Sequence, residues 1–187
     1  MGFMNIPIKP EFFQTTYSEY LLMAQHWTCW KTYVFSLPWY ILVLSFIIPW
    51  IVWWKLVDKE RFISIVIVGL VVSFISSAID EIGCMLVLWE YPYKIVPLFP
   101  RIIPADYAFL PVSYMLIYQY FRDWKSFFWV SFAQAIIFGL IFEPLLVKMN
   151  LYVMINWYHS YSVPLYLLMA IFTKWFVTIV FNIQHQK

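Results

Sequence analysis

Five long apolar segments constrain the fold of this chain more than any other feature. They run approximately over residues 33–56, 62–89, 105–121, 127–147 and 162–183. A helix needs roughly 20 apolar residues to cross the hydrocarbon core of a bilayer, and each segment meets or approaches that length. Helices are expected because a backbone inside a bilayer has to satisfy its own hydrogen bonds. The sequence therefore predicts an all-α polytopic membrane helix bundle with about five transmembrane helices.

Composition agrees with a chain whose main partner is the lipid bilayer. Hydrophobic residues make up 64% of the sequence and charged residues only 12%, far from the average of soluble domains. Tryptophan and tyrosine flank the apolar segments, where their rings settle at the headgroup level; examples are Trp50, Trp53, Trp54, Trp89, Trp124 and Trp157. The net charge of +2 is dispersed, so nucleic acid is not expected as a partner.

The N-terminal region has a different pattern. In residues 11–30 apolar side chains recur at helical spacing, namely Phe13, Tyr17, Leu21, Ala24 and Trp27. This pattern predicts an amphipathic helix lying in the membrane interface. We therefore divide the chain into an interfacial segment, 1–31, and a transmembrane bundle, 32–187. Lysine and arginine are more numerous beside the first and third loops between the spans, which favours an outside N-terminus and an inside C-terminus.

Acidic residues converge on one membrane face. With five spans, the second ends, the third begins, the fourth ends and the fifth begins on the same side. Asp80 and Glu81 lie about two turns before the second span ends, Asp106 in the first turn of the third, and Glu143 one turn before the fourth ends. A carboxylate at the centre of a membrane helix costs about 2.5–3.5 kcal/mol, so such groups face the bundle interior. The sequence thus predicts a pocket around these four acids.

Neighbouring residues indicate how the pocket is built. A stripe of small and polar side chains turns Asp80 inward and allows close helix approach; it comprises Ser73, Ser76, Ser77, Gly83 and Cys84. Pro144 removes a helical hydrogen bond and disfavours helical geometry at Glu143, which predicts a kink. Tyr107, Tyr114 and Tyr118 share one helix face and, with Trp157, complete the candidate pocket as an aromatic wall. Ordinary packing between helices is the alternative explanation for why these tyrosines share one helix face.

Other roles for these side chains remain open. Asp106 also suits the positive end of a helix dipole. Asp80 and Glu143 would merely fasten helices if they paired with Lys94, Arg101 or Lys148. His159 is expected to be exposed, with proton transfer as the alternative. The sequence has no metal-ligand spacing, and no metal or cofactor is expected.

Two segments resemble a known family. They are YPYKIVPLFPRIIPADYAFLPVSYMLIYQYF and FEPLLVKMNLYVMINWYHSYSVPLY, residues 91–121 and 142–166. They resemble the uncharacterised small multipass membrane proteins of spore-forming Firmicutes catalogued under a clostridial "CBO" locus tag. The likeness spans roughly residues 76–183, and its elements are Asp80, Tyr91–Tyr93, Pro104–Asp106, Tyr118–Phe121, Glu143–Pro144 and Trp157. It implies a multipass architecture in a bacterial cytoplasmic or spore membrane, and it implies no reaction.

Three function hypotheses follow. The first is a non-enzymatic membrane protein with a structural or hydrophobic-ligand-binding role, because no DDxxD, HExxH, Walker or GxSxG motif is present. The second is a membrane enzyme acting on a lipid or isoprenoid, a cyclase or isomerase in which Asp80 or Glu143 donates the first proton. The third is a proton-coupled transporter, for which a homodimer would supply ten spans. No catalytic residue is assigned.

Overall fold

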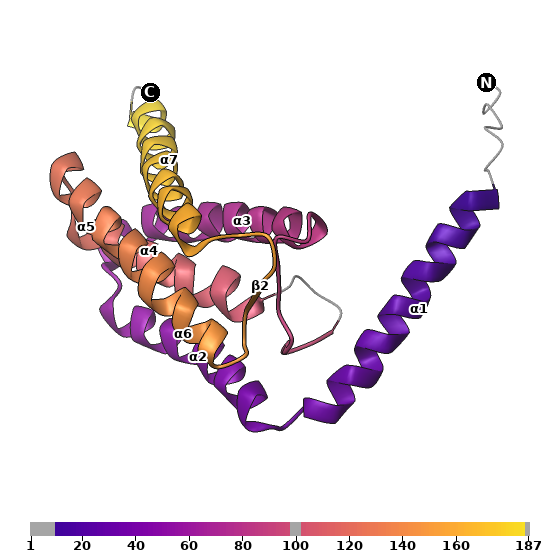
Figure 1. Cartoon of the computed structure of the whole chain (residues 1–187). Coiled ribbons are helices and arrows are strands. Elements are labelled where there is room, and N and C mark those ends of the chain that lie inside the picture. The colour runs from indigo at the N-terminus through magenta and orange to yellow at the C-terminus, as the bar shows by residue number, and fades with distance from the viewer. Residues whose placement is uncertain (1–9, 98–101, 186–187) are drawn as a thin grey trace, which may run out of the picture.

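The chain folds as an all-α helical bundle (Figure 1). The computed structural model describes residues 10–97 and 102–185. Four stretches are long and apolar enough to cross a membrane: Leu37–Leu56, Lys59–Met85, Trp124–Lys148 and His159–Asn182. The remaining predicted span is also helical, but its helical stretch, which ends at Tyr120, is shorter than these four. The predicted fold class is therefore confirmed, with four stretches of spanning length in the described ranges.

The first helix leads away from the bundle. Helix α1 (Pro10–Tyr33) is largely exposed and diverges from the other helices in Figure 1, while α2 (Leu37–Leu56) lies against them. The junction of the two helices is fixed by their indoles, because Trp30 and Trp39 both donate to the Ile95 carbonyl, at 2.9 and 3.1 Å. The predicted helix is present, and its place in the membrane interface stays a prediction.

Helix α3 (Phe62–Met85) follows a short 3-10 turn, η1 (Lys59–Arg61), and is the centre of the bundle. Its polar stripe faces inward as predicted, since Ser76, Asp80, Gly83 and Cys84 are all buried. Gly69 allows close packing, because a Cβ there would lie 2.6 Å from the sulfur of Met115. Small residues thus bring neighbouring helices close enough to bury polar side chains between them.

Two π-helical turns interrupt the remaining spans. The first, η2 (Ala105–Phe109), leads into α4 (Leu110–Tyr120). The second, η3 (Phe138–Phe142), joins α5 (Trp124–Ile137) to α6 (Glu143–Lys148).

Each π turn comes immediately before a helix that has proline at its first or second position. The Leu110 amide donates to Ala105 and the Glu143 amide to Phe138, in both cases five residues back. This wider turn accommodates a proline ring that would otherwise clash with the preceding turn. Glu143 keeps helical φ and ψ angles of −60° and −49° although Pro144 disfavours them, and the irregularity predicted at this point takes the form of the π turn before it.

A short antiparallel pair of strands closes one end of the bundle. Strand β1 (Trp89–Glu90) pairs with β2 (Val153–Met154), with Trp89 opposite Met154. Helix α7 (His159–His185) begins just after β2. The strands tie the loop after α3 to the loop after α6. Consequently the end of α3, the start of α4, the end of α6 and the start of α7 meet here, and we call this the cavity end.

The opposite end of the bundle is held by Gln119, which is 7% exposed. Its amide oxygen accepts from the Asp58 backbone at 2.9 Å, and its amide nitrogen donates to the Leu56 carbonyl at 2.8 Å. One side chain therefore satisfies two backbone groups where α2 ends. We call this the clamp end.

Lys174 of α7 completes the clamp end, although it is only 4% exposed. Its ammonium lies over the Phe127 ring, 4.2 Å from the centroid. It donates to three successive carbonyls, those of Phe121, Arg122 and Asp123, at 3.2, 2.8 and 3.2 Å. All three ammonium donors are therefore used, which makes the burial of this charge tolerable.

Candidate functional site

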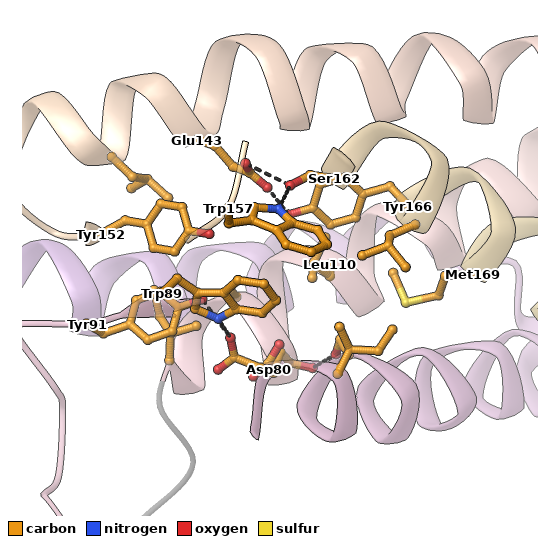
Figure 2. A pocket seen from close by; sticks show the side chains of 17 residues that line it. Asp80, Trp89, Tyr91, Leu110, Glu143, Tyr152, Trp157, Ser162, Tyr166 and Met169 are labelled. Atoms are coloured by element: carbon orange, nitrogen blue, oxygen red, sulfur yellow. Dashed lines mark hydrogen bonds between the residues drawn. The ribbon is translucent and has the colours of Figure 1, made fainter. Parts of the chain in front are cut away.

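A cavity of about 110 Å³ lies at the cavity end of the bundle. Its lining comes from α3, η2, α4, α6 and α7 and from the loops that β1 and β2 connect. Figure 2 shows Asp80 and Glu143 on opposite sides of this space, with the indoles of Trp89 and Trp157 between them. The cavity combines apolar walls with a few converging polar groups, which is the usual composition of a ligand site.

Local backbone geometry positions two of the acids. Asp106 lies within the π turn η2, and Glu143 is the first residue after the π turn η3. In each case a proline follows the acid closely in the sequence: Pro111 follows Asp106, and Pro144 follows Glu143. A π turn therefore contains one carboxylate and immediately precedes the other, and π turns of this kind often occur at functional sites.

Glu143 is 7% exposed and is held by side chains of α7. Its Oε2 accepts from Ser162 Oγ at 2.9 Å and lies 3.1 Å from His159 Nδ1. Its Oε1 accepts from the Tyr166 hydroxyl at 2.9 Å. Ser162 also accepts from Trp157 Nε1 at 2.9 Å, so the indole is connected to the carboxylate through one hydroxyl. Helix α7 thus supplies the donors that keep this acid in the bundle.

Asp80 is held from the loop after α3. Its Oδ1 accepts from Trp89 Nε1 at 2.8 Å and from the Tyr91 hydroxyl at 2.7 Å. The Trp89 ring packs directly on Gly83, where an added Cβ would collide with the indole. Trp89 also meets the Trp157 ring edge to face, with centroids 5.1 Å apart. The two indoles therefore link the Asp80 and Glu143 hydrogen-bond groups across the cavity.

The phenols of Tyr91 and Tyr152, outside the spans, remain neutral. Burial raises the pKa of Tyr91 well above its usual range, and the Asp80 carboxylate raises it further. Burial also raises the pKa of Tyr152, with smaller effects from Glu143 and Asp80. The rings of Tyr91 and Tyr152 stack at 5.3 Å. Both hydroxyls stay protonated at neutral pH, because ionising them would place another negative charge beside the acids.

Asp106 is the most buried of the three cavity acids. It is 3% exposed, and its Oδ2 accepts no hydrogen bond within the described part of the chain. Ser76 Oγ donates to the Asp106 backbone carbonyl at 3.4 Å and also interacts with the Asp106 carboxyl group, but no described donor reaches Oδ2. A buried acceptor left without a donor costs about 1–3 kcal/mol.

Four of the eight predicted pocket residues line the cavity. These are Asp80, Asp106, Glu143 and Trp157. Glu81 is half-buried on α3 and does not line the cavity, since it points about 100° away from Asp80 around the helix.

The predicted aromatic wall of α4 lies elsewhere. Tyr114 is buried in the core, where its hydroxyl donates to the Tyr166 carbonyl at 2.7 Å. Tyr118 lies under the Arg61 guanidinium, 5.1 Å away, and Tyr107 is half-buried outside the cavity lining. Helical rise explains the difference, because Tyr118 is about 18 Å further along the helix than Asp106.

The lining also contains five aromatic or polar side chains that the sequence analysis did not assign to the pocket: Trp89, Tyr91, Tyr152, Ser162 and Tyr166. For two pairs of these residues, the spacing in the sequence could have shown that they share one side of an element. Ser162 and Tyr166 are four residues apart and so share a helix face. Trp89 and Tyr91 are two apart in an extended segment and so share a side.

The predicted ion pairs are only partly placed. Lys94 lies 3.5 Å from Glu90 rather than pairing with Asp80 or Glu143. The basic side chain described beside Glu143 is His159. His159 is half-buried rather than fully exposed, with 30% of its side chain accessible. Arg101 lies outside the described residues, so a pair with it stays a prediction. Across residues 10–97 and 102–185, no group of three or more His, Cys, Asp or Glu is arranged to hold a metal ion.

These features define an aromatic-rich multipass membrane protein with an acid-lined cavity between its helices. Comparison with family models, with curated proteins and with solved structures finds no match. The resemblance to the Firmicutes family therefore stays a prediction.

Proposed function

We propose that this chain is a non-enzymatic membrane protein that binds a small ligand in the cavity between α3, α4, α6 and α7. The observation that carries the proposal is the cavity itself, in which three buried carboxylic acids and two indoles converge. A membrane bundle that needed only stability would gain by filling this space with apolar side chains. Retaining both the space and the acids is the arrangement expected of a binding site.

The size of the cavity limits what it holds. Its volume of about 110 Å³ is somewhat smaller than an engineered cavity of about 150 Å³ that binds benzene. A ligand of a few heavy atoms, or the polar head of a lipid, fits this space, whereas a polyprenyl chain does not. The kind of membrane that contains the protein is indicated only by the family resemblance, which favours a bacterial cytoplasmic or spore membrane.

The test is to fill the cavity with a larger side chain and to determine whether the purified protein still retains a bound small molecule. Leu165 lines the cavity on α7, whereas Leu168 on the same helix is 61% exposed. We expect mass spectrometry of the detergent-purified wild type to detect a bound small molecule that Leu165→Trp has lost and Leu168→Trp retains. If the wild type is empty, or if both variants retain the molecule, the cavity is not its binding site.

A membrane enzyme remains the second candidate because of one contact. His159 is partly accessible and lies 3.1 Å from Glu143, so it can pass protons between the membrane surface and a cavity acid. If the protein is an enzyme, Glu143→Gln will abolish conversion of a bound substrate without releasing it. If it only binds, the molecule recovered from the wild type will be chemically unchanged during prolonged incubation.

A further inference from the structure

The hydrogen bonds of the cavity acids indicate which polar group a ligand of this cavity would have to supply. Glu143 accepts from Ser162 and Tyr166, so each of its oxygens has a donor. Asp106 lines the same cavity, and its buried Oδ2 accepts from no described residue. A complementary occupant must therefore bring a hydrogen-bond donor to Asp106. An occupant with only acceptors would leave this oxygen unsatisfied and add repulsion.

The charge of the lining favours a cation as that donor. The described residues that line the cavity include three carboxylic acids and no lysine, arginine or histidine, and the nearest basic group is His159, which lies behind Glu143 at 3.1 Å. A donor that is positively charged forms a shorter and stronger hydrogen bond to a carboxylate than a neutral donor does. A neutral alcohol would satisfy the acceptor without the added attraction between opposite charges.

Aromatic side chains complete the match to a small organic cation. The rings of Trp89 and Trp157 line the cavity together with those of Tyr91, Tyr152 and Tyr166. Indole and phenol rings attract ammonium groups through their electron-rich faces, and the same rings pack against short hydrocarbon chains.

We infer that the cavity binds a small primary amine in its protonated form, with the ammonium donating to Asp106 and a short hydrocarbon part packed among the aromatic rings. This inference rests on the proposed ligand-binding function and specifies its chemical class. The amine belongs either to a free small molecule or to the ethanolamine head of a lipid, since both present the same ammonium group.

The test compares three probes of similar size on the intact protein in detergent near neutral pH. Butylamine is a cation, butanol is neutral and butyrate is an anion. We expect butylamine to raise the thermal unfolding midpoint and to give measurable binding by calorimetry, with butanol weaker and butyrate without effect. This series needs no mutation, so it does not depend on the folding of any variant.

Two substitutions locate the binding. Asp106→Asn keeps the size of the side chain and removes its negative charge, and we expect butylamine affinity to fall roughly 10- to 100-fold. Glu60→Gln removes an exposed acid at the other end of the bundle and should leave the affinity unchanged. Recovery of an ethanolamine lipid from the wild type, lost in Asp106→Asn and displaced by butylamine, would assign the amine to a lipid head.

The outcomes separate the two proposals. If butanol or butyrate binds as well as butylamine, or if Asp106→Asn binds butylamine normally, the amine inference fails while the ligand cavity stands. If no probe binds and the wild type also purifies empty, both proposals fail.

Discussion

The two ends of the bundle both bury polar side chains, but they satisfy them differently. At the clamp end, Lys174 donates to three carbonyls and Gln119 uses both its amide oxygen and its amide nitrogen. At the cavity end, Asp106 Oδ2 is buried without a donor beside an open space of about 110 Å³. Buried atoms without a described partner also occur at the clamp end, at Trp53 Nε1 and Thr173 Oγ1, so we take a missing partner to point to binding only where it adjoins an open space, as at Asp106. Lys174 and Gln119 thus hold the fold with all their groups used, whereas Asp106 has an acceptor with no described donor beside the space that we propose as a ligand site.

The strongest test of the clamp end is Lys174→Met. The variant keeps the hydrocarbon length but leaves the Phe121, Arg122 and Asp123 carbonyls without their shared donor. We expect the free energy of unfolding to fall by on the order of 3 kcal/mol, measured by denaturant titration in mixed micelles. Lys125 is exposed, so Lys125→Met should change little. An equal loss in both variants would mean that Lys174 is not a specific clamp.

Overpacking tests the cavity end. In Gly83→Ala the new methyl collides with the Trp89 ring, which must move away from Asp80. We expect a loss of about 2 kcal/mol in the free energy of unfolding, together with weaker butylamine binding. Ala78 is exposed on the same helix, and Ala78→Ser serves as the control. Unchanged tryptophan fluorescence in Gly83→Ala would contradict the close packing of Trp89.

Replacing a polar side chain by leucine should have opposite effects at the two ends. Gln119→Leu leaves the Asp58 amide and the Leu56 carbonyl without partners and should destabilise the protein by about 2 kcal/mol. Asp106→Leu removes an unsatisfied acceptor and should stabilise the ligand-free protein by about 1 kcal/mol while abolishing amine binding. Thermal unfolding of both variants in the absence of ligand measures whether each substitution stabilises or destabilises the protein. Destabilisation in both would remove the contrast between the two ends.

The smallest effect concerns the exposed start of α5. Asp123 accepts from the Ser126 amide at 2.7 Å, and this hydrogen bond lowers the pKa of the carboxyl. Its stabilising contribution is therefore present above the unfolded pKa of about 3.9 and is lost as pH falls through the lower folded value. Thermal midpoints between about pH 5 and pH 3 should converge for the wild type and Asp123→Ala. A constant difference across this range would show that the charge contributes nothing.

Much of the fold was predictable because it follows from apolar length and local spacing. The spans and the inward stripe of α3 depend on residues close together in sequence. The approach of Asp80, Asp106 and Glu143 to one cavity was also predictable, because the order of spans fixes which helix ends share a side.

The details of the cavity were less predictable because they depend on contacts between distant segments. Trp89 reaches Asp80 only because its loop folds back on Gly83, and β1 pairs with a strand more than 60 residues away. The tyrosines of α4 share a face, but that face runs along the bundle axis and most of it lies far from the acids. Helical spacing predicts which side chains share a face and gives no information on what that face meets.

The two π turns also bear on how this architecture can vary among related chains. A π turn holds one more residue than an α turn, so each is equivalent to a single-residue insertion, within Ala105–Phe109 and within Phe138–Phe142. Deleting that residue would restore a regular helix and rotate the acid by about 100°. A one-residue gap at either position in the alignment of a relative would therefore indicate that its cavity has lost an acid.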